Sequence, residues 1–229
     1  MGKSKVSIWA FLKFGTKENL LNLMNNGELF INTISAFQEM KDKYRGDIFE
    51  GASTVTPGGK IEKLVYTNSL GQSINFQENG LSVEYLIGRP NWKNKPTHMY
   101  CLYMLKDRSY KKDEQVIDER NLQFGNYALA INNPGEFVER ISSEFNNRRF
   151  KWKADFVTYV EIDSDGRKYD LFKKPQLYDY QNEYRFLIST EEKRAIKVHL
   201  GSLKKISVLL GAEEIRSLRM IDDDEENSV

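Results

Sequence analysis

The chain alternates between short runs of branched or aromatic residues and stretches in which apolar residues recur every three or four positions. The first pattern is typical of buried strands and the second of amphipathic helices. Strands are predicted at residues 7–14, 29–32, 98–105, 123–131, 156–162, 181–189, 196–200 and 206–210. Helices are predicted between the N-cap Thr16 and the stop signal Gly27, and at 33–40, 134–145 and 212–219. This order predicts an α+β protein with mostly antiparallel strands.

Turn residues set the expected organisation of the segment after residue 51. Pro57-Gly58-Gly59 separates the apolar stretches 52–56 and 60–67 and predicts a hairpin there. A second turn is predicted at 68–72, so we expect the middle of the chain to be rich in strands.

Length and composition favour one domain. The 229 residues contain no linker rich in Pro, Gly or Ser, so we expect a single domain at 1–220 and an acidic, disordered tail at 221–229. Hydrophobic residues make up 40% of the chain, and no apolar run approaches the roughly 18 residues of a membrane span. The first residues hold no apolar stretch of signal-peptide length. We therefore expect a cytoplasmic protein without membrane contact.

The charge distribution is uneven. The net charge is +1, but five acidic residues lie consecutively at 222–226, so the rest of the chain is basic. Three basic clusters each contain an aromatic residue: Arg89, Trp92, Lys93 and Lys95; Lys106, Arg108, Tyr110, Lys111 and Lys112; Arg148, Arg149, Lys151, Trp152 and Lys153. Cations beside flat rings suit a single-stranded nucleic acid, through phosphate attraction and base stacking. The alternative is solvated loops whose aromatic residues anchor them to the core.

Metal and thiol chemistry find little support in the sequence. His98 and His199 are the two histidines and Cys101 is the single cysteine, which leaves few soft ligands for zinc. Cys101 stands in an apolar run and is expected to fill the core. We expect no bound metal.

The most specific chemical signal is the stretch Gln181-Asn182-Glu183-Tyr184-Arg185. On a strand, residues 181, 183 and 185 share one face, while Tyr184 and Phe186 point into the opposite, apolar layer. An amide, a carboxylate and a guanidinium would then line one wall. The alternative is the ordinary solvent face of an amphipathic strand.

This stretch resembles the catalytic motif of ADP-ribosyltransferases, in which Gln or Glu stands two residues before a glutamate. The Tyr-Arg that follows is similar to a family of bacterial and phage domains suspected of that fold. The resemblance continues at Phe11-Leu12-Lys13-Phe14, Asn26-Gly27, Leu29-Phe30-Ile31-Asn32-Thr33-Ile34-Ser35 with Phe37, Arg45-Gly46-Asp47 and Phe49-Glu50-Gly51. It covers roughly residues 7–51 and 175–189. It implies a mostly antiparallel split β-sheet with flanking helices and NAD as co-substrate.

The resemblance also implies roles for individual residues. Glu183 would bind the nicotinamide ribose and stabilise an oxocarbenium-like transition state, and Gln181 would orient the acceptor. Residues implied to bind the cofactor are Lys13, Thr33, Ser35, Tyr44, Arg45 and Arg185, with Thr33 or Ser35 supporting Glu183. The alternatives are a solvated lysine for Lys13, a loop anchor for Tyr44, and a locally hydrogen-bonded charged turn for Arg45, Asp47 and Glu50.

Together these features predict an NAD-dependent ADP-ribosyltransferase that modifies nucleic acid, with RNA favoured over DNA. The expected nucleic-acid contacts are Lys93, Lys111, Lys151, Trp152 and Lys153. By resemblance, the setting is a bacterial toxin or phage-defence effector with an antitoxin protein as partner. Glu183 is expected to contribute little to the fold. The alternatives are a non-catalytic nucleotide- or nucleic-acid-binding module on the same scaffold, and a metal-independent nuclease.

Overall fold

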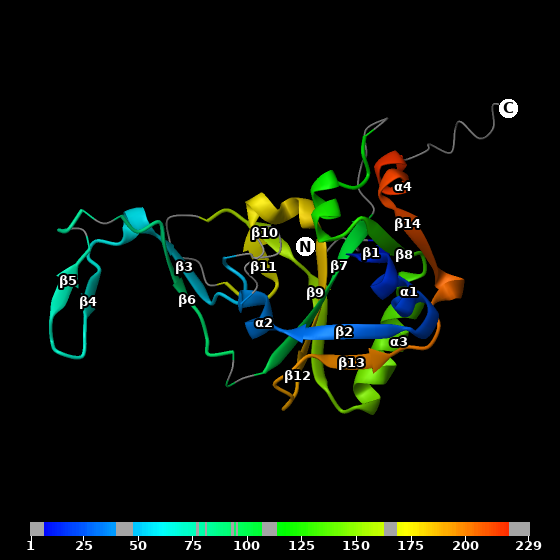
Figure 1. Ribbon diagram of the computed structural model, residues 1–229, viewed down its shortest axis with the longest axis horizontal. Coiled ribbons are helices and arrows are strands. Elements are labelled where there is room, and N and C mark those ends of the chain that lie inside the picture. The colour runs from blue at the N-terminus through cyan, green and yellow to red at the C-terminus, as the bar shows by residue number, and fades with distance from the viewer. Residues whose placement is uncertain are drawn as a thin grey trace, which may run out of the picture.

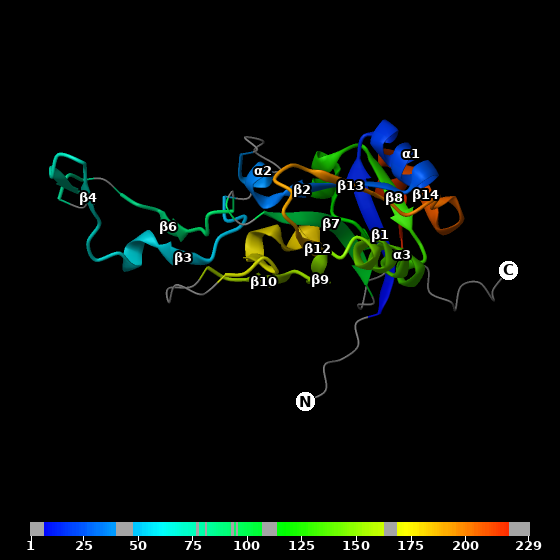
Figure 2. The same cartoon turned by 90° about the horizontal axis from the view of Figure 1, so that it is seen from below.

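The computed structural model describes residues 7–39, 48–76, 78–80, 82–92, 94, 96–106, 114–162 and 169–219. These residues form a mixed α and β protein built on one large antiparallel sheet, with an arm that projects from it (Figures 1 and 2). The predicted α+β class is therefore confirmed. Among the described residues, no helix is both long and apolar enough to cross a bilayer.

The large sheet has eight strands, all paired in antiparallel fashion. They are β1 (Ile8–Gly15), β2 (Glu28–Thr33), β7 (Thr97–Lys106), β8 (Tyr127–Ile131), β9 (Lys151–Phe156), β12 (Glu183–Ser189), β13 (Ile196–His199) and β14 (Ser207–Gly211). The order along one path is β13-β2-β7-β1-β8-β14, and β12 lies between β7 and β9.

One edge of β7 is shared by two strands. β2 pairs with it at His98 and Met99, and β1 pairs with it from Tyr103 onward. In the described part of the chain, the same edge has no strand partner at residues 100–102. The sheet therefore opens between β1 and β2, while the other edge of β7 stays paired with β12 from Thr97 to Tyr103.

The helices begin and end where local sequence provides caps. They are α1 (Lys17–Asn26), α2 (Ile34–Glu39), α3 (Pro134–Asn147) and α4 (Ala212–Ser217). Thr16 caps α1 by accepting a hydrogen bond from the Asn19 amide, and Gly27 ends it with a φ of 63°. Pro134 stands in the first turn of α3. These predicted boundaries are confirmed.

The two faces of the sheet bury different clusters. Helices α1 and α3 cover one face, where Leu23, Phe137 and Phe145 pack with Phe11 and Phe186. The other face buries a smaller cluster with α4, which includes Leu12, Tyr103, Ile117 and Ile215. Tyr184 and Phe186 lie on the α1 and α3 side, as the alternation predicted.

The arm consists of short paired strands. β3 (Thr54–Pro57) pairs with β6 (Tyr85–Gly88), and β4 (Val65–Thr67) pairs with β5 (Ser73–Asn75). The turn predicted at 68–72 is confirmed, because it joins β4 to β5. The hairpin predicted at Pro57-Gly58-Gly59 is wrong. Residues 58–60 form the 3-10 turn η1 (Gly58–Lys60), and the Gly58 amide binds the Glu84 carbonyl 2.7 Å away, so β3 pairs with a distant strand.

Three predicted strands are displaced. The strand expected at 123–131 begins at Tyr127, because residues 123 and 124 end a 3-10 helix. The strand expected from residue 181 starts at Glu183, because the 3-10 helix η3 (Gln176–Gln181) runs up to a left-handed Asn182 with φ 38°. The strand expected at 156–162 is divided into β9, which ends at Phe156, and β10 (Thr158–Val160), which pairs with β11 (Lys173–Pro175). The 3-10 helices η2 (Glu119–Phe124) and η4 (Lys204–Ile206) complete the described elements.

Candidate functional site

Four buried charged side chains form a closed network at the start of β12. Glu183 and Arg185 come from β12, Lys174 from β11 and Glu50 from the turn after residue 47. Each is at most 9% exposed. Two cations and two carboxylates balance, which is how buried charges are tolerated in a protein interior.

Arg185 organises the network. Its Nε donates to Glu183 Oε2 at 2.7 Å, and its terminal nitrogens donate to both carboxylate oxygens of Glu50 at 3.1 and 2.9 Å. A further bond of 2.6 Å reaches the Leu171 carbonyl. The planar guanidinium thus fixes two carboxylates and one loop in a single geometry.

Lys174 completes the network from the opposite side. Its Nζ donates to Glu183 Oε1 and to the Gln181 side-chain oxygen, both at 2.6 Å. Gln181 also donates to the Tyr180 hydroxyl at 3.2 Å. Gln181 precedes the strand, but Lys174 still brings its side chain to Glu183. The predicted proximity of residues 181, 183 and 185 is therefore found, although it arises from a 3-10 helix and a lysine in place of a continuous strand.

Glu183 is ionised. Burial alone would raise the pKa of its carboxyl, but the charges of Arg185 and Lys174 outweigh burial and lower the pKa to about 2. The backbone is fixed as well, because the Glu183 amide donates to the Tyr159 hydroxyl at 2.9 Å. The expectation that Glu183 contributes little to the fold is not supported, because two buried cations depend on its charge.

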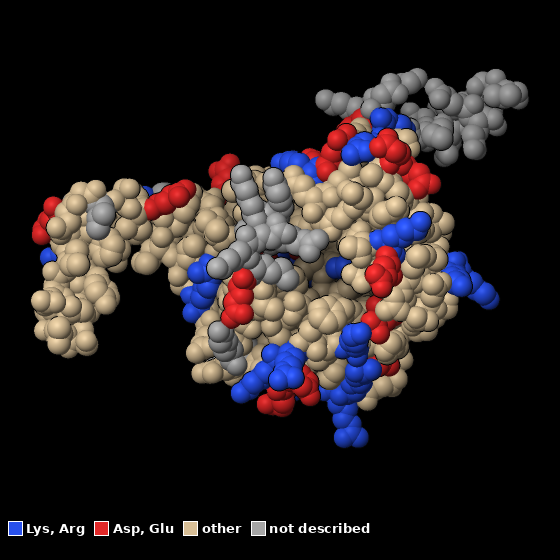
Figure 3. Space-filling model, in the orientation of Figure 1, with Lys and Arg blue, Asp and Glu red and all other residues tan. Residues whose placement is uncertain are grey.

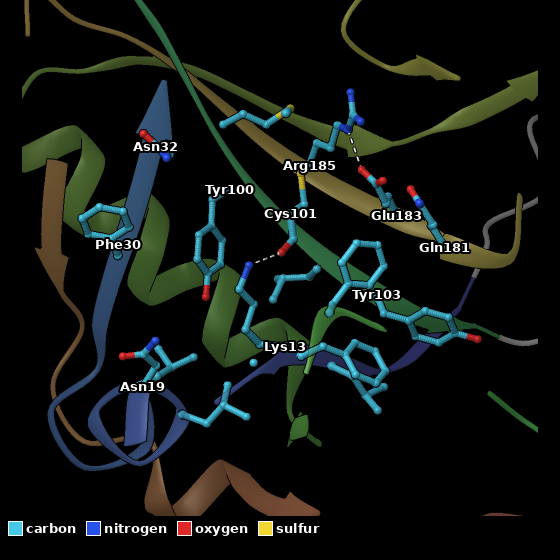
Figure 4. Close-up of a pocket in the computed structure, with 18 of the residues that line it drawn as sticks. Lys13, Asn19, Phe30, Asn32, Tyr100, Cys101, Tyr103, Gln181, Glu183 and Arg185 are labelled. Atoms are coloured by element: carbon cyan, nitrogen blue, oxygen red, sulfur yellow. Dashed lines mark hydrogen bonds and ion pairs between the residues drawn. The ribbon is translucent and has the colours of Figure 1, made fainter. Parts of the chain in front are cut away.

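A cavity of about 680 Å³ opens onto this network. Glu50, Lys174, Gln181, Glu183 and Arg185 line one part of it. Residues 99–103 of β7 line it consecutively, and Figure 4 shows Lys13, Tyr100, Asn19 and Phe30 across β7 from Glu183. Because successive strand residues point to opposite faces, the cavity reaches both faces at the opening between β1 and β2. Its volume lies within the range of pockets that bind small molecules.

Lys13 occupies the opening in the sheet. Its Nζ donates to the Cys101 carbonyl at 2.8 Å and lies 4.3 Å from the centre of the Tyr100 ring. The ammonium thus binds a backbone carbonyl on the stretch of β7 that pairs with β12 on one edge and has neither β1 nor β2 on the other. Burial, followed by the charge of Glu183, raises the pKa of the Cys101 thiol to about 12. Cys101 is half-buried and lines the cavity, so it does not simply fill the core as predicted.

Two predicted cofactor residues lie away from Glu183. The Thr33 and Ser35 hydroxyls are 3.1 Å apart, and Thr33 accepts from the Ala36 amide at the start of α2. Both residues line a second cavity, of about 470 Å³. The predicted support of Glu183 by Thr33 or Ser35 is wrong, because Lys174 and Arg185 hold that carboxylate.

Arg185 has a different role from the predicted one. Its guanidinium donates to two side chains and one carbonyl of the protein, so it positions Glu183 and is not turned toward a cofactor phosphate. Tyr44 and Arg45 lie outside the described residues, as do Lys93 and Lys111.

The remaining predicted nucleic-acid contacts lie on β9. Lys151 and Lys153 are exposed, but Trp152 points to the other face of the strand. Its ring packs 5.9 Å from that of Phe145, and its Nε1 donates to Asn146 at 3.0 Å. Trp152 therefore anchors the strand to the core, as the alternative interpretation held, and does not share a face with the two lysines.

Two residues of the network were missed by sequence reasoning. Lys174 stands in a run of Lys-Lys-Pro that reads as a solvated turn, yet it is 5% exposed. Glu50 was part of the resemblance, with a locally hydrogen-bonded charged turn as the alternative, but its carboxylate binds a residue 135 positions away. No signal in the sequence identified either residue, because Glu183 and Arg185 already balance each other's charge and require no further pair.

Metal ligation has no cluster to support it in the described part of the chain. No group of three or more His, Cys, Asp or Glu residues there is arranged to hold a metal ion. Comparisons of the chain with protein-family models, with curated proteins and with solved structures found no match.

Proposed function

We propose that the protein is an NAD-dependent ADP-ribosyltransferase in which Glu183 is the catalytic carboxylate. The observation that carries this proposal is an ionised, immobilised carboxylate at the base of a cavity of about 680 Å³. Cleavage of the bond between nicotinamide and ribose sends the bonding electrons to the nicotinamide ring and leaves positive charge on the ribose. A fixed anion beside that ribose stabilises the transition state more than the ground state.

The energetics of the network favour a functional role. Replacing a buried ion network by apolar residues of similar volume is often neutral or stabilising, so four buried charges are a poor way to obtain stability alone. Strongly perturbed carboxyl groups that line cavities are common at functional sites. A pKa of about 2 keeps Glu183 anionic at every physiological pH.

Other parts of the cavity suit the rest of the reaction. The ammonium of Lys13 lies on the cavity wall and carries the positive charge that a pyrophosphate requires. Phe30, whose ring is exposed on the cavity wall, supplies flat apolar surface for a nicotinamide or adenine ring. The acceptor attacks the anomeric carbon and loses its proton to water as its bond to ribose forms, because Glu183 is too weak a base to hold that proton. Gln181, bound to the same lysine as Glu183, remains the proposed acceptor-orienting residue.

A second candidate is a nucleotide-binding module without catalysis. It is favoured by the direct ion pairs that both carboxylate oxygens of Glu183 make, at 2.6 and 2.7 Å. In that case the network fixes the shape of the cavity, and the cavity binds a nucleotide without cleaving it.

One experiment separates the two. The rate of nicotinamide release from NAD is measured for the wild type, Glu183→Gln and Glu50→Gln, each normalised to folded protein by circular dichroism. Each variant replaces one of the two carboxylates that bind Arg185. The two variants should therefore lose similar stability, and Glu50→Gln is the control for structural effects. If Glu183 is catalytic, its variant loses about a hundredfold or more in rate, while Glu50→Gln loses much less. Equal losses would assign the network to structure, and a wild type that binds NAD without releasing nicotinamide would favour the binding module.

A further inference from the structure

The second cavity carries a set of side chains that the proposed NAD site does not use. It has a volume of about 470 Å³ and lies where α2 approaches the segment before β13. Its lining includes Lys193 and Arg194, the ring of Trp92, and the polar side chains of Asn32, Thr33 and Ser35. Glu39 and Ala36 also contribute to it.

The two cations differ from those of the buried network. Lys193 and Arg194 are exposed, and neither makes an ion pair with another described residue. Their backbone is nevertheless fixed, because His98 Nε2 donates to the Arg194 carbonyl at 2.8 Å. They are therefore held at the cavity with their charges available to an anion.

Trp92 forms another part of the lining. Its Nε1 donates to the Gly51 carbonyl at 2.9 Å, which holds the indole at a set position. Gly51 itself has a φ of 69°, and a Cβ at this position would lie 2.7 Å from Trp92 Nε1, so the approach requires glycine. A fixed aromatic ring near two cations provides a stacking surface beside a phosphate site.

The second cavity is connected to the first. Asn32 lines both cavities, and it lies on β2 at the opening of the sheet. The turn that binds Trp92 also carries Glu50, whose carbonyl accepts from Gln38 at 3.0 Å and whose carboxylate binds Arg185. Hydrogen bonds at both ends of the short segment 50–51 thus connect Trp92 to Arg185, and Arg185 binds Glu183.

We propose that the second cavity binds the acceptor, a single-stranded nucleic acid, with a phosphate at Lys193 and Arg194 and a base on Trp92. This inference rests on the proposed transferase function. Phosphate attraction combined with stacking is the way in which proteins bind single strands without base pairing. A strand held there passes Asn32 toward the cavity of Glu183. This nucleic-acid site differs from the predicted one on the lysines of β9. In the sheet, β9 lies on one side of β12, and β7, β2 and β13 follow on the other, where Lys193 and Arg194 lead into β13.

The test measures binding of a fluorescent single-stranded RNA of about ten nucleotides by anisotropy at several salt concentrations. The variant is Lys193→Glu with Arg194→Glu, and the matched control is Lys204→Glu with Lys205→Glu, an equal charge reversal on the exposed lysines of η4. The cavity variant should bind at least tenfold more weakly, and the logarithmic salt dependence should fall by about two. The control should change affinity less than threefold.

Two further measurements complete the test. Release of nicotinamide to water should be unchanged in the cavity variant, while transfer of ADP-ribose to the RNA falls with its binding. Trp92→Leu should weaken RNA binding about tenfold, with Trp9→Leu as the control for loss of an indole.

The outcomes are separable. Equal weakening of RNA binding by both charge reversals would overturn the site, because attraction would then be a general property of the basic surface. A raised KM for NAD in the cavity variant, with RNA binding intact, would assign the cavity to the distal part of NAD and also overturn it. A third outcome is that RNA binding is weakened only by the cavity variants, while the wild type never releases nicotinamide from NAD. The second cavity would then remain a nucleic-acid site without an acceptor role. The proposed transferase function would be rejected by this separate measurement.

Discussion

The two cavities hold their charges in opposite ways. In the first, Arg185 and Lys174 are at most 5% exposed, and each binds carboxylates within the protein. In the second, Lys193 and Arg194 are exposed and make no ion pair within the described part of the chain. Figure 3 shows one face of the body, with Lys and Arg side chains spread around a hollow, while the arm is mostly uncharged.

This difference follows from desolvation. A buried charge without a partner costs several kcal/mol, so the first cavity must carry cations and anions in equal number. A charge at the surface remains hydrated, so it needs no partner within the protein and is available to bind a ligand. Mutations at the first cavity should therefore change stability and chemistry together, whereas mutations at the second should change binding alone.

The largest effect is expected from Arg185→Met. Removal of the guanidinium leaves Glu50 and Glu183 buried beside each other with Lys174 as the remaining cation. Breaking a buried ion network in this way costs about 3–5 kcal/mol of unfolding free energy. Lys193→Met also replaces a cation by methionine, but at an exposed site. Its unfolding free energy should stay within about 0.5 kcal/mol of the wild-type value. Urea unfolding measures both, and a loss below about 1 kcal/mol for Arg185→Met would remove the contrast between the cavities.

A second large effect is expected on acidification. The pKa of the Glu183 carboxyl is lowered from its ordinary 4.5 to about 2 in the folded protein, so the folded state holds this proton less tightly. The stabilisation is complete above pH 4.5 and is lost as the pH falls through 2. It amounts to about 3 kcal/mol in total.

Comparison of variants isolates this contribution from the other carboxyl groups. Between pH 6 and pH 2.5, Glu183→Gln should lose less unfolding free energy than the wild type. In a variant with Lys193→Met and Arg194→Met, the unfolding free energy should fall with pH by the same amount as in the wild type. Parallel curves for all three proteins would show that Glu183 is not the carboxyl group with the lowered pKa.

The fold was more predictable than the network, and the reason is the range of the interactions involved. The boundaries of α1 depend on Thr16 and Gly27, which act on their own neighbours, and both were correct. The pairing of β3 with β6 depends on residues about 30 positions apart, and the local signal at residues 57–59 gave the wrong partner.

Alternation along β12 predicted which side chains face the core, because period two is a property of any strand. It could not identify Lys174 or Glu50, because nothing local to either residue shows that it is buried. The burial of Lys174 depends on the Glu183 carboxylate, 9 positions away in the sequence, and the burial of Glu50 depends on Arg185, 135 positions away. Lysine side chains are usually exposed to solvent. Sequence patterns therefore do not identify a buried lysine whose charge is neutralised by a carboxylate elsewhere in the chain.

A smaller effect is expected from Lys13→Met. Lys13 is partly buried, and its Nζ hydrogen bond to the Cys101 carbonyl covers the opening of the sheet. A charged hydrogen bond of this kind contributes about 1.5 kcal/mol, and methionine keeps much of the apolar stem. If the ammonium also binds a pyrophosphate, the KM for NAD should rise about tenfold with little change in kcat. An unchanged KM would limit Lys13 to its structural bond, and steady-state kinetics with unfolding data on one preparation decide the matter.

The smallest effect on stability, and the most informative on mechanism, is expected from Gln181→Ala. Gln181 is 5% exposed and accepts a hydrogen bond from Lys174. In the variant, Lys174 still has Glu183 as a partner, so the unfolding free energy should fall by about 1 kcal/mol. If Gln181 orients the acceptor, transfer of ADP-ribose should fall by more than the slow hydrolysis of NAD to water. If Gln181 acts only by holding Lys174 against Glu183, both activities should fall together in the folded protein, because the carboxylate itself is then misplaced. Gln181→Glu sharpens the distinction, since a carboxylate still accepts from Lys174 but adds a negative charge to a balanced network. Loss of transfer with retained hydrolysis in Gln181→Ala would show that Gln181 orients the acceptor at the first cavity, whereas equal losses would leave Trp92, Lys193 and Arg194 at the second cavity as the proposed acceptor contacts.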